Sequence, residues 1–268
     1  MKLAILGPEG SFSEKAARQW NDKAELRYYD DILDTVDALL RKEVDFSIVP
    51  IENSLEGSIT LTLDLLMEQQ LSITGEVVVQ VKHCLLSKGR LADIKILMSI
   101  PQALSQCKKY IKKNFRNIEV RSTLSTSQAA KLASESKEIA AIASRESARI
   151  YGLEILDENI QDMNENFTRF IVIGKTVPPP TGNDKTSLIV YLEKNRPGAL
   201  YEILGEFANK GIDLTKIESR PTKKVLGDYL FYIDLKGHIE DKKIKDALGK
   251  VKGKVGMLKI LGSYPAAE

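Results

Sequence analysis

Three consecutive prolines constrain the fold of this chain more than any other feature. Pro178, Pro179 and Pro180 lie just before Gly182. Proline fixes φ and removes a backbone donor, so this run favours a stiff extended spacer that continues neither a helix nor a central strand. A chain of 268 residues is long enough for about two domains. We therefore expect one domain over residues 1–176 and another over residues 185–268.

Composition and charge exclude several classes of protein. The 39 basic and 37 acidic residues give a net charge of +2, which offers no electrostatic footprint for nucleic acid. No apolar run approaches the roughly 20 residues that span a bilayer. The amino end passes directly into an apolar strand and lacks the cleavage region of a signal peptide. We expect a cytoplasmic protein that binds neither nucleic acid nor membrane.

The few cysteines and histidines do not suggest a metal site. Cys84, Cys107, His83 and His238 are scattered along the chain, and there is no Cys-x-x-Cys pair. Buried free thiols are the better interpretation. Neighbours on a strand point to opposite faces, so His83 is badly placed to activate Cys84. We expect neither a metal nor another cofactor.

The segment after the prolines has a simple alternation of patterns. Strand-like and helix-like stretches follow one another at 186–193, 197–208, 212–219, 229–235, 244–251 and 255–261. The second and fifth have helical spacing of apolar residues, and the others favour strands. The order β-α-β-β-α-β predicts a ferredoxin-like domain.

Before the prolines, strands alternate with helices, which predicts an α/β domain with a mostly parallel sheet. Polar residues follow four strand ends, and they include Ser11, Asn53, Ser125 and Ser144. Ligands bind at the carboxyl edge of such sheets, where helix N-termini favour anions. Each cluster alone is also what helix capping requires. No Gly-x-Gly-x-x-Gly motif is present, so a small anion is favoured over a dinucleotide.

The stretch from Asn166 to Phe170 sets the hydroxyl of Thr168 beside the guanidinium of Arg169 at a strand entrance. Such a pair can grip a carboxylate and offer one further hydrogen bond. Two phenyl rings flank it, which suits a small anionic substrate with a ring. The same residues are also ordinary sheet sequence when considered alone.

These motifs resemble, in order along nearly the whole chain, those of the prephenate dehydratase family. The matching stretches are Gly7–Ser13, Pro50–Ser58, Pro101–Cys107 and Asn166–Phe170. The tail resembles the phenylalanine-binding ACT domain. The resemblance implies two α/β lobes similar to periplasmic binding proteins, at about 1–79 plus 162–176 and at 80–161, followed by the ACT domain. Because the chain begins at the dehydratase strand, it looks like the monofunctional form, without a fused chorismate mutase.

The implied reaction converts prephenate to phenylpyruvate, releasing carbon dioxide and water without a cofactor. By resemblance, Thr168 donates a proton or hydrogen bond to the departing hydroxyl. Arg169 holds a carboxylate, directly or through a neighbour. Further substrate-site candidates are Glu52, Asn53, Ser99, Gln106 and Phe170, together with the hydroxyls of Ser11, Thr123 and Ser125, which helix capping also explains. Ile100 stands where the family often has His.

The resemblance also implies feedback by L-phenylalanine and a homodimer or homotetramer. The effector-site candidates are Asn195, Gly198, Ala199, Leu200, Glu218, Ser219 and Arg220. Gly198 and its neighbours would offer helix N-terminal amides to the amino-acid carboxylate. Two alternatives remain at this stage: an arogenate dehydratase, and a non-catalytic sensor of aromatic amino acids.

Overall fold

The computed structural model describes residues 1–192, 196–223, 225 and 227–267. The chain divides into two compact units, residues 1–63 with 77–170 and residues 64–76 with 171–268. Helix α3 (Thr60–Glu68) and strands β5 (Ser72–Gln80) and β11 (Phe167–Gly174) contribute residues to both units. The proline run lies in residues 175–183, which form neither helix nor strand.

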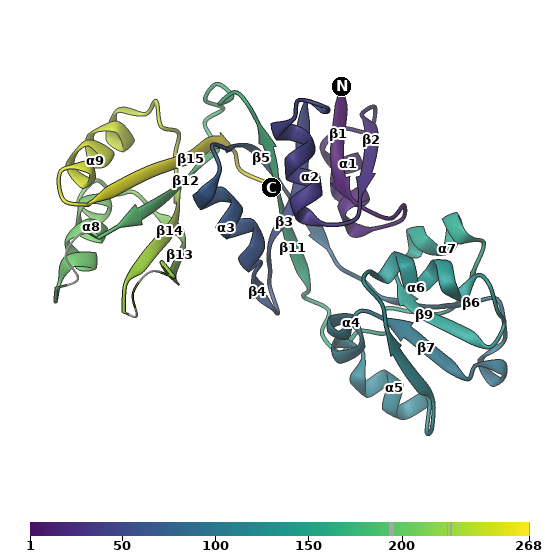
Figure 1. Cartoon of the computed structure of the whole chain (residues 1–268). Helices are drawn as coiled ribbons and strands as arrows, with labels where there is room; N and C mark the ends of the chain where they lie inside the picture. The colour runs from purple at the N-terminus through teal and green to yellow at the C-terminus, as the bar shows by residue number, and fades with distance from the viewer. Residues whose placement is uncertain (193–195, 224, 226, 268) are drawn as a thin grey trace. The chain divides into compact units, whose positions relative to one another are not determined.

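The first sheet has the strand order β2-β1-β3-β11-β5, and β4 pairs with β3 (Figure 1). Its other elements are β1 (Lys2–Leu6), α1 (Phe12–Trp20), β2 (Glu25–Tyr29), α2 (Ile32–Leu40), β3 (Phe46–Asn53) and β4 (Gly57–Ser58). Strand β1 pairs in parallel with β2 and β3. Leu3, Ala4 and Ile5 are fully buried, which is typical of a central parallel strand covered on both faces.

The second sheet has the order β10-β6-β9-β7-β8. Its elements are β6 (Cys84–Ser87), a short 3₁₀ turn (Leu91–Asp93), β7 (Ile96–Ser99), α4 (Pro101–Gln106), α5 (Lys108–Asn114), β8 (Glu119–Ser122), α6 (Thr126–Ala133), β9 (Ile139–Ala143), α7 (Arg145–Tyr151) and β10 (Glu154–Glu158). Strands β8, β7 and β9 are parallel because helices cross between them. Strands β6 and β10 run antiparallel to their neighbours, so this sheet is mixed.

The second sheet is covered on both faces. Cys84 and Leu86 pack in one cluster with α6, whereas Leu85 packs in another with Cys107. Both cysteines are free and buried, as the sequence predicted. Burial raises the pKa of the Cys107 thiol to about 12, with the charge of Asp162 acting in the same direction. The two thiols are therefore part of the core.

The hydroxyls expected after the strand ends begin helices. Ser11 Oγ accepts from the amide of Glu14 at 3.2 Å, and Ser125 Oγ accepts from that of Gln128 at 3.0 Å. Ser144 caps α7 in the same way. The Glu14 carboxylate accepts from the amide of Gly10 at 2.7 Å. Capping therefore accounts for part of this polar pattern, and the helix N-termini lie where the sequence placed them.

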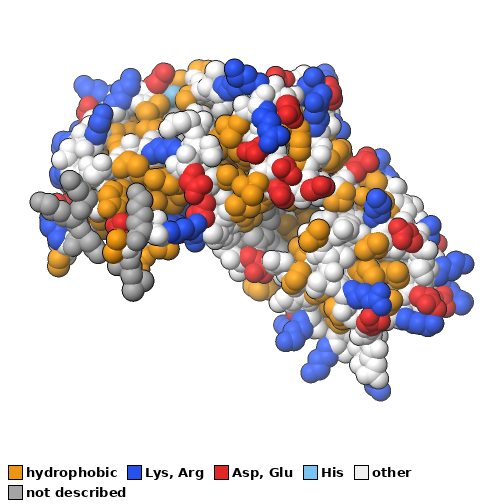
Figure 2. All heavy atoms as spheres, in the orientation of Figure 1, with side chains coloured by type: hydrophobic (Ala, Val, Ile, Leu, Met, Phe, Trp, Pro, Cys, Tyr) orange, Lys and Arg blue, Asp and Glu red, His pale blue; other side chains and the backbone are white. Residues whose placement is uncertain are grey.

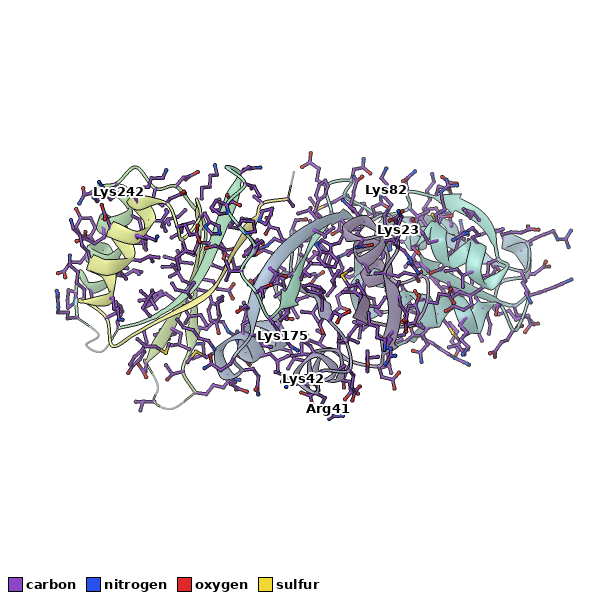
Figure 3. All side chains as sticks on the ribbon, turned by 90° about the horizontal axis from the view of Figure 1, so that it is seen from above. Lys23, Arg41, Lys42, Lys82, Lys175 and Lys242 are labelled. Carbon is purple, nitrogen blue, oxygen red and sulfur yellow. The ribbon has the colours of Figure 1, made fainter. Side chains whose placement is uncertain are left out.

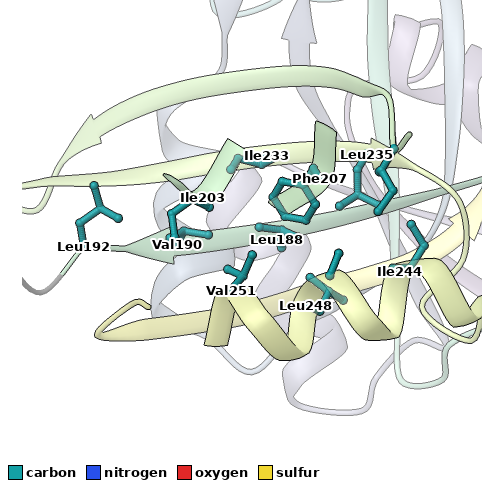
Figure 4. Packing of buried hydrophobic residues seen from close by; sticks show 12 residues of the cluster. Leu188, Val190, Leu192, Ile203, Phe207, Ile233, Leu235, Ile244, Leu248 and Val251 are labelled. Carbon is teal, nitrogen blue, oxygen red and sulfur yellow. The ribbon is translucent and has the colours of Figure 1, made fainter. Parts of the chain in front are cut away.

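The C-terminal sheet has the antiparallel order β13-β14-β12-β15, which confirms the ferredoxin-like arrangement. Its elements are β12 (Asp184–Tyr191), α8 (Ala199–Ala208), β13 (Leu214–Pro221), β14 (Tyr229–Lys236), α9 (Lys242–Lys252) and β15 (Met257–Pro265). Phe207 of α8 and Val251 of α9 pack on Leu188 and Ile233 of the sheet (Figure 4). The helix expected to open at Pro197 begins at Ala199, because its left-handed N-cap Gly198 (φ +84°) precedes it.

The surface carries both signs of charge. Lys, Arg, Asp and Glu side chains are interspersed on the visible face (Figure 2), and Lys23, Lys42 and Lys242 are exposed (Figure 3). Among the described residues, no helix is long and apolar enough to cross a membrane. In the same part of the chain, no group of three or more His, Cys, Asp or Glu could hold a metal ion.

Candidate active site

A cavity of about 470 Å³ lies within the unit formed by residues 1–63 and 77–170. It is lined by residues of β1, β3 and β11 of the first sheet and by residues that follow β7 and β8 of the second sheet. Its polar lining includes Ser11, Asn53, Glu56, Gln106, Asn166 and Thr168, and its apolar lining includes Leu6, Phe12, Val81, Ile100 and Phe170. The cavity therefore combines an apolar wall with a convergent group of amides and hydroxyls, as small-molecule sites commonly do.

Strand β11 presents alternate residues to this cavity. Thr168 and Phe170 line it, whereas Arg169 between them does not. Side chains on a strand alternate between its two faces, which explains this division. Phe170 is 2% exposed and so also belongs to the core.

Asn53 fixes the hydrogen-bonding role of Thr168. Asn53 Oδ1 accepts from the backbone amides of Leu55 at 2.9 Å and Glu56 at 3.1 Å. Two backbone donors on that oxygen leave no ambiguity about the orientation of the Asn53 side-chain amide. Its Nδ2 must therefore be the donor in the 2.9 Å contact with Thr168 Oγ1.

The Thr168 hydroxyl consequently acts as an acceptor toward Asn53. A hydroxyl has one hydrogen to donate, and a donor cannot occupy the position of that hydrogen. The Thr168 hydrogen is thus directed away from Asn53 and can be offered to a molecule in the cavity. This geometry suits a residue that donates to an oxygen of the substrate.

A chain of amides extends from Asn53 across the cavity wall. Asn53 Nδ2 also donates to Asn166 Oδ1 at 2.7 Å, and Asn166 Nδ2 donates to Gln106 Oε1 at 2.9 Å. Gln106 Nε2 donates to Glu56 Oε1 at 3.3 Å. The chain connects Asn53 of β3, Gln106 of α4 and Asn166, which directly precedes β11, so the orientation of each amide depends on the next one.

The described lining of the cavity carries no Lys or Arg side chain. Helices α1 and α6 begin there, since Phe12 and Thr126 both belong to the lining. Helix N-termini carry partial positive charge and unpaired amides. Anionic groups of a ligand can therefore be held by these helix ends and by hydroxyls.

Four of the expected substrate-site residues are not among the cavity lining that the structure describes: Arg169, Glu52, Ser99 and Thr123. Arg169 Nε donates to Glu52 Oε1 at 2.6 Å, and the Arg169 side chain is 7% exposed. The hydroxyl of Ser99 donates to the carbonyl of Ile142 at 2.6 Å and ties β7 to β9. The structure brings together the other six: Thr168, Phe170, Asn53, Gln106, Ser11 and Ser125.

Sequence reasoning named no role for three residues of this site. Asn166 and Glu56 lie inside the motifs but were not singled out as site residues. The available signal was that an amide and a carboxylate stand close to Thr168 and Asn53 in the sequence. His83 was assigned to a strand alone, yet it lines the cavity and its Nε2 contacts Gln106 Oε1 at 3.1 Å. Burial lowers the pKa of His83, and the hydrogen bond to Gln106 acts in the opposite direction.

The expected effector residues lie on two elements of the C-terminal domain. Gly198, Ala199 and Leu200 form the start of α8, and Glu218, Ser219 and Arg220 lie on the edge strand β13. Asn195 lies outside the described residues. Each group is on the element where the sequence placed it.

The sequence profile of one family covers most of the chain. The prephenate dehydratase profile matches residues 3–178. This chain belongs to the prephenate dehydratase family. The ACT domain profile matches residues 186–253. The prephenate dehydratase of Methanocaldococcus jannaschii is 43% identical over 268 residues, which cover 97% of each protein.

Solved structures of similar proteins cover nearly the whole chain. A prephenate dehydratase from Arthrobacter aurescens in complex with L-Phe has a TM-score of 0.89 and 34% identity, covering 99% of this chain and 90% of that one. A second structure, described as GqqA, a novel type of quorum-quenching acylase, has a TM-score of 0.89 and 32% identity, covering 99% and 98%. The family's fold therefore appears under two described activities.

Proposed function

We propose that this member of the prephenate dehydratase family converts prephenate to phenylpyruvate, carbon dioxide and water. The ring carboxylate leaves as carbon dioxide, its bonding electrons enter the ring, and the ring hydroxyl departs. Aromatisation drives the step. The substrate is a dianion and the organic product a monoanion, so one proton must be supplied to the departing oxygen.

The observation that carries this proposal is the direction of the Thr168 hydroxyl. Because Asn53 Nδ2 donates to Thr168 Oγ1 at 2.9 Å, the Thr168 hydrogen is available to the leaving oxygen. Thr168 protonates that oxygen as the carbon–oxygen bond breaks and regains a proton from solvent. A positioned proton donor contributes roughly 10²–10⁴-fold to the rate.

The surroundings of the cavity suit decarboxylation. A cation gripping the departing carboxylate in the ground state would stabilise it more than the transition state, in which its charge has moved into the ring. Among the described lining residues no Lys or Arg is present to do so. The pyruvyl carboxylate keeps its charge, and the N-termini of α1 and α6 are suited to hold it.

Replacement of Thr168 tests this proposal. Thr168→Ala should lower kcat for phenylpyruvate formation by roughly 10²–10⁴-fold, because the proton donor is lost. Thr168→Ser is the matched control, since it keeps the hydroxyl and should lose much less. Thermal unfolding of both variants checks that the fold is intact. Undiminished turnover by Thr168→Ala would remove Thr168 from the reaction.

Two other activities are alternatives to this one. Arogenate carries an ammonium where prephenate has a keto oxygen, and Glu56 is the one carboxylate among the described lining residues. Turnover of prephenate and arogenate, compared directly, decides between the two substrates.

An acylase needs a nucleophile with an adjacent base, whereas Thr168 is hydrogen-bonded to an amide. A sensor without activity would bind L-phenylalanine and turn over neither substrate.

We propose that L-phenylalanine binds the ACT domain and inhibits the enzyme. The start of α8 offers backbone amides to its carboxylate, and Gly198 holds a left-handed conformation there (φ +84°). Gly198→Ala should raise the L-phenylalanine concentration for half-inhibition by about tenfold, because side chains rarely adopt that conformation. Gly205→Ala is the control on the same helix, since an added methyl group meets nothing within 4 Å.

In the same proposal the enzyme is a cytoplasmic homodimer or homotetramer. The edge strand β13 exposes Ile217, which is 47% accessible, next to the effector-site candidates. An edge strand is a surface that a second chain can cover. Light scattering should give the mass of two or four chains, and a mass of one chain would contradict this proposal.

A further inference from the structure

The imidazole of His83 lies at the end of the amide chain, in a position that the reaction itself does not use. It is 2% exposed and makes an edge-on contact with Phe12, at 6.0 Å between ring centres. Its Nε2 contacts Gln106 Oε1 at 3.1 Å. Its Nδ1 is buried and has no hydrogen-bond partner among the described residues.

The neighbouring contacts determine the tautomer of this ring. Asn53 is oriented by two backbone amides, so Asn166 must turn its Oδ1 toward Asn53 and its Nδ2 toward Gln106. Gln106 must then present Oε1 to Asn166, and the same oxygen faces His83. An oxygen cannot donate, so His83 Nε2 carries the hydrogen and Nδ1 carries the lone pair.

We propose that His83 is a positioning residue that, as the neutral Nε2–H tautomer, holds Gln106 and Asn166 in the orientation in which Asn166 Oδ1 accepts from Asn53, the residue that donates to Thr168. This role rests on the proposed function of Thr168. The opposite tautomer would turn a lone pair toward Gln106 Oε1 and favour rotation of that amide. If the Gln106 amide rotated, its NH₂ group would face the NH₂ group of Asn166. Rotation of Asn166 would relieve that contact but would turn its NH₂ group toward the NH₂ group of Asn53.

The position of the ring supports a role inside the protein rather than on the substrate. Nδ1 has essentially no accessible surface, so a ligand in the cavity does not reach it. Nε2 is already engaged with Gln106. Burial lowers the pKa of His83, which favours the neutral ring that this arrangement requires. His83 therefore acts through Gln106 and Asn166.

The tautomer can be measured without any assay of turnover. The chain has two histidines, so protein labelled with ¹⁵N-histidine gives two ring spin systems. The His83→Gln variant lacks one of them, which assigns the signals of His83. Long-range ¹H–¹⁵N spectra at neutral pH should show the Nε2–H tautomer for His83. A ring carrying its hydrogen on Nδ1, or a doubly protonated ring, overturns the proposal whether or not the enzyme acts on prephenate.

Two substitutions then test the consequence for turnover. The amide nitrogen of Gln can occupy the position of Nε2, whereas that of Asn falls near Nδ1. His83→Asn should lower kcat by about tenfold with KM changed less than threefold, as expected for one lost hydrogen bond in a positioning network. His83→Gln should recover most of that loss. Equal kcat values for the two variants would overturn the role of the Nε2 hydrogen.

Discussion

Thr168 and Arg169 are neighbours on β11, yet their side chains have different surroundings. Thr168 faces the cavity and accepts a hydrogen bond from Asn53 at 2.9 Å. Arg169 is paired with Glu52 at 2.6 Å and is absent from the described cavity lining. Both residues belong to the motif that suggested a carboxylate-binding site. The two faces of one strand therefore divide that motif into a hydroxyl that lines the cavity and a charge that is paired with Glu52.

The comparison shows that adjacency in a motif does not imply a shared site. On a strand, residues i and i+2 share a face and residue i+1 lies on the other. Phe170 accordingly joins Thr168 in the cavity wall. Arg169 contacts Glu52 on β3, the strand that also carries Asn53. We propose that Arg169 acts on the substrate indirectly through this contact, which is one of the two roles that the sequence left open.

On the cavity face of β11, we expect the largest loss of activity from a substitution of Asn53, the residue that donates to Thr168. Asn53→Asp keeps an oxygen for the amides of Leu55 and Glu56 but has no hydrogen to give Thr168. The carboxylate instead accepts the Thr168 hydrogen, which is then withdrawn from the substrate. We expect kcat to fall about 100-fold, within the range for loss of a positioned proton donor. Steady-state kinetics with prephenate measure this.

The control for that prediction is Asn53→Ala. It removes the same amide but leaves the Thr168 hydroxyl free to rotate toward the substrate. Asn53→Asp should therefore be the slower of the two, although alanine is the greater change in shape. If Asn53→Asp is as active as Asn53→Ala, the direction of the Thr168 hydrogen does not limit the reaction.

Strand ends and helix starts could be predicted from the sequence because their signals are local. The α/β alternation, the capping serines and the βαββαβ order needed only periodicity and turn residues. The opposite-face rule that separated His83 from Cys84 also applies to Thr168 and Arg169. Applied there, it would have indicated that the two do not face the same ligand.

The amide chain could not be predicted in this way. Asn53 and Asn166 are 113 positions apart, and Asn166 and Gln106 are 60 apart. Whether an amide contacts another depends on how β3, β11 and α4 pack, and no local pattern encodes that. Ser99 shows the opposite case. It was expected in the substrate site, but its hydroxyl donates to the backbone carbonyl of Ile142 on β9.

The other face of β11 is tested by Arg169→Met, which removes the charge and keeps most of the apolar stem. The free energy of unfolding should fall by about 2 kcal/mol, since hydrogen bonds to charged groups contribute about 1.5–3 kcal/mol. The Glu52 side chain is 31% exposed and can hydrate, so the loss stays below that of a fully buried pair. Denaturant unfolding measures the change, and kcat should fall less than tenfold.

Glu52→Gln and the double variant isolate the pair. If Arg169 acts through Glu52, the double variant is less destabilised than the sum of the two single variants, because each single change already removes their interaction. KM for prephenate should change similarly in all three, since each disturbs β3 in the same way. A KM raised more than 100-fold by Arg169→Met alone, with stability unchanged, would instead make Arg169 a direct contact of the substrate carboxylate. The two faces of β11 would then share one ligand.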